Sequence, residues 1–164
     1  MRAQRRPARR SAEAGTTARP PGLRLDLGGS AKGFVADRAA ALLGAPCAVD
    51  CGGDMRVRGA HEVRVTHPFG GEPAAVIALS DGAVATSGVD ARLWSRAHHH
   101  LLDPATGAPA WTGVVSATAL APTAAEAEAL AKAALLSGPG AGLELLARRG
   151  GGVLVLDDGD AVTT

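Results

Sequence analysis

The stretch "LDLGGSAKGFVADRAAALLG", residues 25–44, decides how the fold is interpreted. A short apolar run reaches Asp26, a Gly-Gly pair follows, and Lys32 stands in the first turn of a segment with helical spacing. A serine precedes this segment and a glycine ends it, as is common at the two ends of a helix. The pattern therefore predicts a strand over residues 23–27 and a helix over residues 30–43.

The glycine-rich joint between these two elements has two interpretations. Gly28 and Gly29 before a helix start would leave backbone N–H groups at the positive end of the helix dipole, which suits a phosphate. A lysine in the first turn is unfavourable for the helix itself, so a bound anion would explain Lys32. The joint matches neither common phosphate-loop pattern, G-x-G-x-x-G or G-x-x-x-x-G-K-[ST]. A tight turn with an exposed lysine is therefore the alternative.

The remaining segments change irregularly between strand-like and helix-like patterns. Residues 74–88 have the pattern of a β-hairpin with Asp81-Gly82 at the turn. Thr123 and Glu126 form a capping-box pattern at the start of a helix. This irregular order predicts an α+β fold, with a mixed or antiparallel sheet and helices packed on it. Further strands are predicted over 46–53, 54–59, 62–68, 114–120 and 152–162, and helices over 123–138 and 141–149.

Length and composition indicate one domain behind a charged leader. The 164 residues are 46% hydrophobic but only 2% aromatic, so Ala, Val and Leu must form the core. Residues 1–24 hold seven arginines and one glutamate. We expect a disordered Arg-rich leader over residues 1–22 and the folded domain over residues 23–164.

The same composition narrows the partners and the location. The leader has no aromatic residues to stack on bases, so no nucleic-acid partner is expected. It has the positive start of a signal peptide but no apolar region after it, so no export signal is predicted and a cytoplasmic location is the default. No window approaches the ~18 apolar residues of a membrane-spanning helix.

Five segments, in order, carry a resemblance to a known family: "DLGGSAKG", "VDCGGD", "ATSG", "HHLLDPATG" and "VSATALAPTAAEAEALAK". Together they resemble the C-terminal half of the ApbE-type flavin transferases, also called FAD:protein FMN transferases. The resemblance implies an enzyme that cleaves the pyrophosphate of FAD and transfers FMN to a threonine hydroxyl of an acceptor protein, using Mg²⁺. Such phosphoryl transfer requires cations on the phosphate oxygens and a correctly placed hydroxyl.

The resemblance also assigns roles to individual residues. His100, three residues before the Asp-Pro of the turn, would orient or deprotonate the attacking hydroxyl. Without the resemblance, the three histidines at 98–100 indicate only a polar strand edge or a loose metal-binding tract. The other positions that it implies are Asp26, Gly28, Lys32 and Leu101 for FAD, and the Gly29 carbonyl and Glu128 for the metal.

The chain departs from the family pattern on the helix after Pro122. The family has an Asp and, four residues later, a Thr as metal ligands, whereas this chain has Glu128 and Lys132. Glutamate can bind magnesium, but the ammonium group of lysine has no acceptor atom. Lys132 therefore either forms an i,i+4 ion pair with Glu128 or places its ammonium group where the metal charge would be.

Three functions remain possible at this stage. A shortened flavin transferase is the first, a catalytically impaired flavin- or nucleotide-binding remnant the second, and a structural fragment that needs a partner chain the third. The segments of the resemblance lie between Asp26 and Gly138, and the domain is expected to be partial because the N-terminal half of the family pattern is missing. A homodimer, with FAD bound within one chain or between two, is also possible.

Overall fold

A six-stranded antiparallel sheet forms the body of the protein in the computed structural model, which describes residues 11–13, 16–18, 21, 27–95 and 98–164. The strand order is β10-β9-β8-β5-β4-β3, and every neighbouring pair is antiparallel. The predicted α+β class is confirmed, with the antiparallel form of the sheet. The strands are β3 (Cys47–Asp50), β4 (Asp54–Val65), β5 (Ala75–Gly88), β8 (Val114–Ala121), β9 (Gly152–Leu156) and β10 (Ala161–Thr163).

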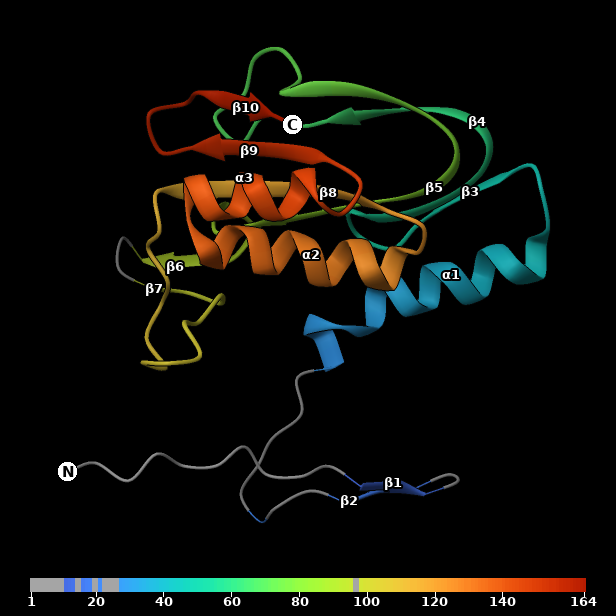
Figure 1. The fold of residues 1–164 in the computed structure, drawn as a ribbon, viewed down its shortest axis with the longest axis horizontal. Coiled ribbons are helices and arrows are strands. Elements are labelled where there is room, and N and C mark those ends of the chain that lie inside the picture. Colours follow the sequence, from blue (N-terminus) through green and yellow to red (C-terminus); the bar gives the residue numbers. More distant parts are fainter. Residues whose placement is uncertain (1–10, 14–15, 19–20, 22–26, 96–97) are drawn as a thin grey trace.

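Three helices, α1 (Ala31–Leu43), α2 (Ala124–Ser137) and α3 (Pro139–Ala147), cover one face of this sheet (Figure 1). All three lie close to the predicted ranges. The helix–sheet interface consists largely of alanines, including Ala85, Ala119, Ala127 and Ala131, all fully buried. Such small side chains let helix and sheet approach closely, with Leu135, Leu146 and Leu154 filling the remaining space.

The first turns of α1 and α2 are locked together. A Cβ atom on Gly33 would lie 2.4 Å from the Ala124 carbonyl oxygen, so only glycine permits this approach. Asp37 of α1 accepts the backbone N–H groups of Ala124 at 2.9 Å and Ala125 at 3.0 Å, which caps α2 from outside. The cap predicted within α2 is also present, because Thr123 accepts the Glu126 N–H at 3.2 Å. These contacts fix which side chains of α1 and α2 face each other.

The face of the sheet away from the helices has a core of its own. Side chains alternate along β5, so Val84 lies opposite the helix-facing Ala83 and Ala85. Val84 packs there with Val57 and Val63 of β4, and all three are buried although the described helices α1, α2 and α3 lie on the other face. The long strands β4 and β5, which carry these three valines, are strongly curved (Figure 1).

The predicted hairpin over residues 74–88 is wrong, because β5 is one continuous strand. Asp81 and Gly82 lie in the middle of β5 and pair with Arg58 and Val57 of β4. The register shifts just beyond, between Arg58 and His61, and Gly82 has a φ of 142°. The turn-forming dipeptide therefore serves a bend in the strand. The two strands predicted over 54–59 and 62–68 are likewise one strand, β4.

The described part of the leader is an antiparallel pair, β1 (Ser11–Glu13) with β2 (Thr16–Ala18). These residues differ from the disorder expected over 1–22, most of which lies outside the described residues. The strand predicted over 23–27 lies outside them too, except for Leu27, which begins a 3-10 turn, Leu27–Gly29. The domain boundary at residue 22 stays a prediction. Within the described residues, no helix combines the length and apolarity needed to cross a membrane.

Candidate functional site

Lys32, in the first turn of α1, reaches across to the loop between β3 and β4. Its Nζ donates to the Gly52 carbonyl at 3.1 Å and lies 3.0 Å from Oδ2 of Asp54. The Asp54 side chain is 1% exposed, whereas that of Lys32 is 35% exposed. Burial raises the pKa of Asp54, although the Lys32 ammonium opposes this shift. Lys32 therefore acts as the counterion of a carboxylate that lies beneath it.

A second buried carboxylate, Glu128 of α2, lies between the two helices. Its Oε1 accepts from Lys132 Nζ at 2.9 Å and its Oε2 accepts from the Gly33 N–H at 3.0 Å. Burial acts to raise the pKa of Glu128, but the hydrogen bonds from Lys132 and Gly33 and the charges of Lys132 and Lys32 together hold it below the usual value. Glu128 is thus ionised, and each of its two oxygens accepts a hydrogen bond from a neighbouring residue.

We call Lys32, Asp54, Glu128 and Lys132 the lysine–carboxylate cluster. The two pairs lie within each other's electrostatic field, since Glu128 and Lys132 influence the pKa of Asp54 and Lys32 influences that of Glu128. The carboxylates are almost fully buried, while the side chains of Lys32 and Lys132 are 35% and 25% exposed. The cluster therefore presents positive charge to solvent over buried negative charge.

The histidine segment lies beside this cluster, in a small hairpin of β6 (Leu93–Ser95) and β7 (His98–His99). His99 is buried, accepts the Leu101 N–H at its Nδ1 and packs edge-on against Trp111 at 4.5 Å. His100 follows, and its buried Nδ1 has no hydrogen-bond partner among the described residues. Burial lowers the pKa of His100, and the nearby charges of Arg92 and Lys132 lower it further. His100 is therefore neutral at neutral pH and able to accept a proton.

The turn after the histidines is held by its own side chains. Asp103 accepts the Ala105 N–H at 2.8 Å and the Thr106 hydroxyl at 3.1 Å, while the Gly107 N–H donates to the Asp103 carbonyl at 2.7 Å. Leu101, expected at the FAD site, is 6% exposed and packs in the helix-side core. Its backbone carbonyl accepts from the Ala110 N–H, and a contact of Leu101 with FAD stays a prediction.

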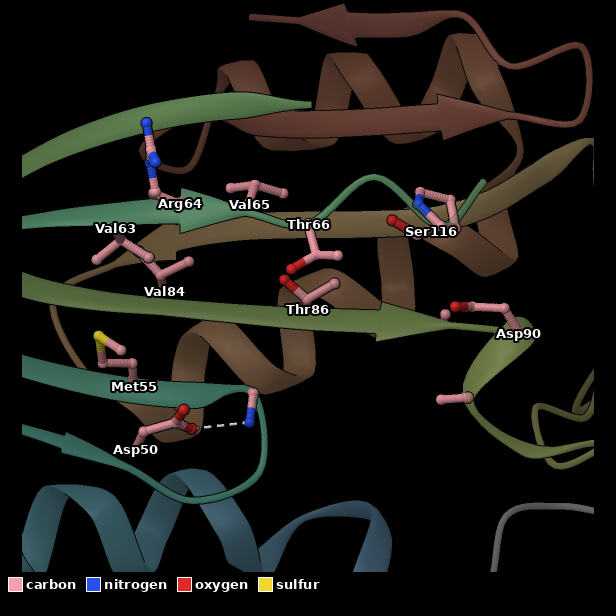
Figure 2. A pocket seen from close by; sticks show the side chains of 14 residues that line it. Asp50, Met55, Val63, Arg64, Val65, Thr66, Val84, Thr86, Asp90 and Ser116 are labelled. Atoms are coloured by element: carbon pink, nitrogen blue, oxygen red, sulfur yellow. Dashed lines mark hydrogen bonds between the residues drawn. The ribbon is translucent and has the colours of Figure 1, made fainter. Parts of the chain in front are cut away.

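A pocket of about 340 Å³ opens on the other face of the sheet (Figure 2). Met55, Val63 and Val84 line one end, and Thr86 and Ser116 lie toward the other. The pocket meets the cluster at the loop between β3 and β4, because Asp50 and Gly53 line the pocket whereas Gly52 and Asp54 contact Lys32. An apolar pocket and the ammonium group of Lys32 thus flank a single glycine-rich loop.

Of the predicted site residues, Lys32 and Glu128 lie in the lysine–carboxylate cluster, and His100 lies close enough for the charge of Lys132 to lower its pKa. Gly28 is exposed and Gly29 half-buried in the turn directly before α1, and Asp26 lies outside the described residues. Sequence reasoning did not select Asp54 or Gly33 as site residues. The Asp of "GGD" after a predicted strand was the available signal for Asp54. No sequence signal identifies Gly33, since its importance depends on how closely two helices approach.

The residues present do not suit the magnesium site that the resemblance implies. Both oxygens of Glu128 are engaged, by Lys132 and by the Gly33 N–H, and Asp54 is paired with Lys32. Lysine supplies no oxygen, and magnesium requires near-octahedral oxygen coordination. Among the described residues, no group of three or more His, Cys, Asp or Glu side chains is placed to hold a metal.

The fold and the cluster define an α+β protein that presents cations suited to an anionic ligand. The sequence model of the ApbE family matches residues 2–156, and the chain belongs to this family. The match spans the predicted boundary at residue 22.

Individual relatives support the same assignment. The FAD:protein FMN transferase of Treponema pallidum (strain Nichols) is 38% identical over 140 residues, which are 71% of this chain and 39% of that protein. The enzyme of the same name from Escherichia coli (strain K12) is 30% identical over 160 residues, 88% of this chain and 46% of that one. The chain thus spans less than half the length of these curated relatives.

Solved structures agree on the fold. The ApbE protein of Thermotoga maritima superposes with a TM-score of 0.80 at 32% identity, covering 90% of this chain and 53% of that one. The flavin transferase ApbE of Vibrio cholerae superposes with a TM-score of 0.72 at 23% identity, covering 94% and 55%. The second likeness concerns the fold alone.

Proposed function

We propose that this chain transfers FMN from FAD to a threonine hydroxyl of an acceptor protein. The observation that carries the proposal is a cluster with two partly exposed lysines, Lys32 and Lys132, together with a neutral histidine, His100, whose pKa the Lys132 charge helps to lower, in a chain of the ApbE family. Phosphoryl transfer is catalysed mainly by positioning and by cations that neutralise the phosphate oxygens. The cluster and the histidine supply these two requirements.

In the proposed reaction the threonine oxygen attacks the phosphorus on the FMN side of the pyrophosphate. The bond from that phosphorus to the bridging oxygen breaks, and AMP leaves with the electron pair. The product is a phosphodiester between FMN and the acceptor. His100 accepts the hydroxyl proton, while Lys32 and Lys132 offset the charge on the phosphate oxygens. No step is assigned to magnesium, because the donor set does not suit it.

The pocket on the open face of the sheet offers space for part of the FAD molecule. Its volume of about 340 Å³ is within the usual range for small-molecule sites, and its apolar end suits an aromatic ring. A dinucleotide across the loop between β3 and β4 would contact the pocket at one end and the cluster at the other. Asp26 and Gly28, directly before α1, remain proposed contributors to FAD binding.

The test is a flavin-transfer assay with the purified chain. FAD is added together with an acceptor domain that a full-length family member modifies at threonine, and flavin fluorescence on a denaturing gel reports covalent transfer. We expect AMP release and a fluorescent acceptor band with the unaltered chain, and rates of both lower by about 100-fold or more with His100→Gln. FAD hydrolysis without acceptor labelling, or no reaction at all, would contradict the proposal.

A flavin-binding protein without transfer activity is the second candidate. The observation in its favour is the Glu128–Lys132 pair, which occupies the carboxylate expected to bind metal. FAD binding without acceptor labelling would identify this function.

Sedimentation velocity with and without FAD tests the proposed homodimer. A cytoplasmic location remains a prediction.

A further inference from the structure

The charges within the lysine–carboxylate cluster balance without a metal ion. It contains two ammonium groups and two carboxylates, paired as Lys32 with Asp54 at 3.0 Å and Lys132 with Glu128 at 2.9 Å. A buried charge without a partner is strongly disfavoured, so each carboxylate requires its lysine. A divalent cation added here would have to displace Lys132 from Glu128 and lie close to a second ammonium group.

The position of Lys132 gives its ammonium group a second contact surface. One side is bound to Glu128 Oε1, and the side chain is still 25% exposed. An ammonium group has three donors, so bonds to one carboxylate oxygen leave capacity for an incoming ligand. The charge of Lys132 influences the pKa of both Asp54 and His100, so this member of the cluster lies within electrostatic reach of the histidine.

From this arrangement we infer that the Lys132 ammonium takes the place of the divalent cation, so that the chain binds the pyrophosphate of a dinucleotide without metal. The inference rests on the proposed function only in taking FAD as the ligand. A metal ion is then not required, because the ammonium groups of Lys32 and Lys132 are the cations that contact the phosphate oxygens. Replacing Lys132 with threonine should free Glu128 and supply a hydroxyl oxygen, which creates a metal site.

The first experiment measures metal binding without flavin. Mn²⁺, which takes oxygen ligands like Mg²⁺, is titrated into the purified chain up to about 1 mM and followed by electron paramagnetic resonance. We expect no saturable binding by the unaltered chain and saturable binding by Lys132→Thr. The matched control is Arg148→Thr, which breaks the exposed i,i+4 pair Glu144–Arg148 on α3 and should create no site.

Two outcomes would overturn the inference. One is saturable Mn²⁺ binding by the unaltered chain, and the other is a folded Lys132→Thr variant that binds no Mn²⁺. Circular dichroism establishes whether the variant is folded. If Lys132→Thr does not fold, Glu128→Gln/Lys132→Thr removes the unpaired carboxylate, and Mn²⁺ titration of the unaltered chain still decides the question.

The second experiment measures FAD affinity by fluorescence, with EDTA or with Mg²⁺. We expect the unaltered chain to bind equally well in both buffers, and Lys132→Thr to bind at least about tenfold more tightly with Mg²⁺ than with EDTA. A similar gain with Mg²⁺ in the unaltered chain would overturn the inference. Absence of FAD binding in every buffer would contradict the proposed function, and the Mn²⁺ titrations would still decide whether Lys132 replaces the metal.

Discussion

At the scale of single residues, Lys32 both stabilises the fold and remains accessible to a ligand. It neutralises Asp54, which is almost completely buried, and it keeps a third of its own side chain accessible. The Lys32 ammonium group, which stabilises the fold, can therefore also contact a ligand. The cost of losing Lys32 should appear in stability as well as in binding, and the two effects can be separated.

We predict that Lys32→Met lowers the free energy of unfolding by about 2 kcal/mol, since Asp54 then lies buried without a counterion. This figure is below that for a fully buried pair, because Lys32 is partly solvated. Burial already raises the pKa of Asp54 above 3.8, so its ionised form weakens the folded state at neutral pH. The loss should shrink as the pH falls toward that raised pKa and Asp54 takes up a proton.

Urea denaturation of a double-mutant cycle measures this effect. Lys32→Met/Asp54→Asn should recover most of the lost stability, because the amide needs no counterion. Arg148→Met, at an exposed ion pair, is the control and should change stability by less than about 0.5 kcal/mol. Equal losses in the single and double variants would show that Lys32 stabilises the fold through its aliphatic stem instead.

His100 gives a prediction about pH. Burial and the charges of Arg92 and Lys132 lower its pKa below the usual 6.5, so the neutral form persists to lower pH than for a solvated histidine. If His100 accepts the hydroxyl proton, the flavin-transfer rate should decline at low pH with a midpoint below 6.5. Initial rates of AMP release between about pH 5 and 8.5 give the profile.

Two variants define the meaning of that profile. His100→Gln should reduce the rate by about 100-fold or more, as expected for loss of a general base, and should remove the decline at low pH. His61→Gln, on the outer part of β4, should leave both unchanged. A decline centred above 6.5, or one that survives in His100→Gln, would assign the titration to another group.

At the scale of elements, the decisive feature is how closely α1 and α2 approach. Gly33 lies against the Ala124 carbonyl, and Asp37 caps α2. The same approach lets the Gly33 N–H reach Glu128. The predicted anion site at the start of α1 thus has a carboxylate of the protein itself at one of its N–H groups.

We predict that Gly33→Ala destabilises the protein by about 1–3 kcal/mol, because its Cβ would overlap backbone atoms of Ala124 that cannot move independently. The control is Gly140→Ala in α3, where the added Cβ would have no described atom within 4 Å apart from its chain neighbours and the backbone of its own helix. That substitution should be neutral or stabilise by up to about 1 kcal/mol, since alanine favours helices. Thermal unfolding followed by circular dichroism compares them. Similar melting temperatures would contradict the close approach.

The elements that follow local rules were predictable from the sequence. Helical spacing and end signals gave α1, and the pattern of Thr123 and Glu126 gave the start of α2. The β5 strand was not predictable, because Asp81-Gly82 is a turn signal locally and only pairing with β4 keeps both residues within one continuous strand. The Lys32–Asp54 and Gly33–Glu128 contacts were hidden for the same reason, since both join residues distant in the sequence.

At the scale of the whole molecule, the sheet separates two cores that differ in side-chain composition. The helix side is packed mostly with alanine and leucine, whereas the open side is packed with valines of β4 and β5. The pocket lies on the open side and shares Val63 and Val84 with that core. The curvature of β4 and β5 therefore affects both the stability of the open-side core and the shape of the pocket.

We predict that Val57→Ala costs about 2 kcal/mol, as for a side chain in an ordinary core, although the described helices lie on the other face of the sheet. Val57 is fully buried and does not line the pocket, so the loss should come from packing alone. Val76→Ala, at a β5 position that is 51% exposed, should change stability by less than about 0.5 kcal/mol. Urea denaturation measures both, and equal small changes would show that the open face does not form a core.

The Gly33 amide hydrogen offers a way to observe the cluster directly. This N–H group is part of α1 and donates to the buried Glu128 of α2 at 3.0 Å, so the hydrogen bond joins the two helices. A hydrogen bond to a carboxylate moves an amide proton resonance downfield, and glycines occupy their own region of a ¹⁵N correlation spectrum. Anything that draws Glu128 toward another partner must shift this one signal. The protein thus carries an internal indicator, readable without a label on any ligand, of whether Glu128 still faces its own helices.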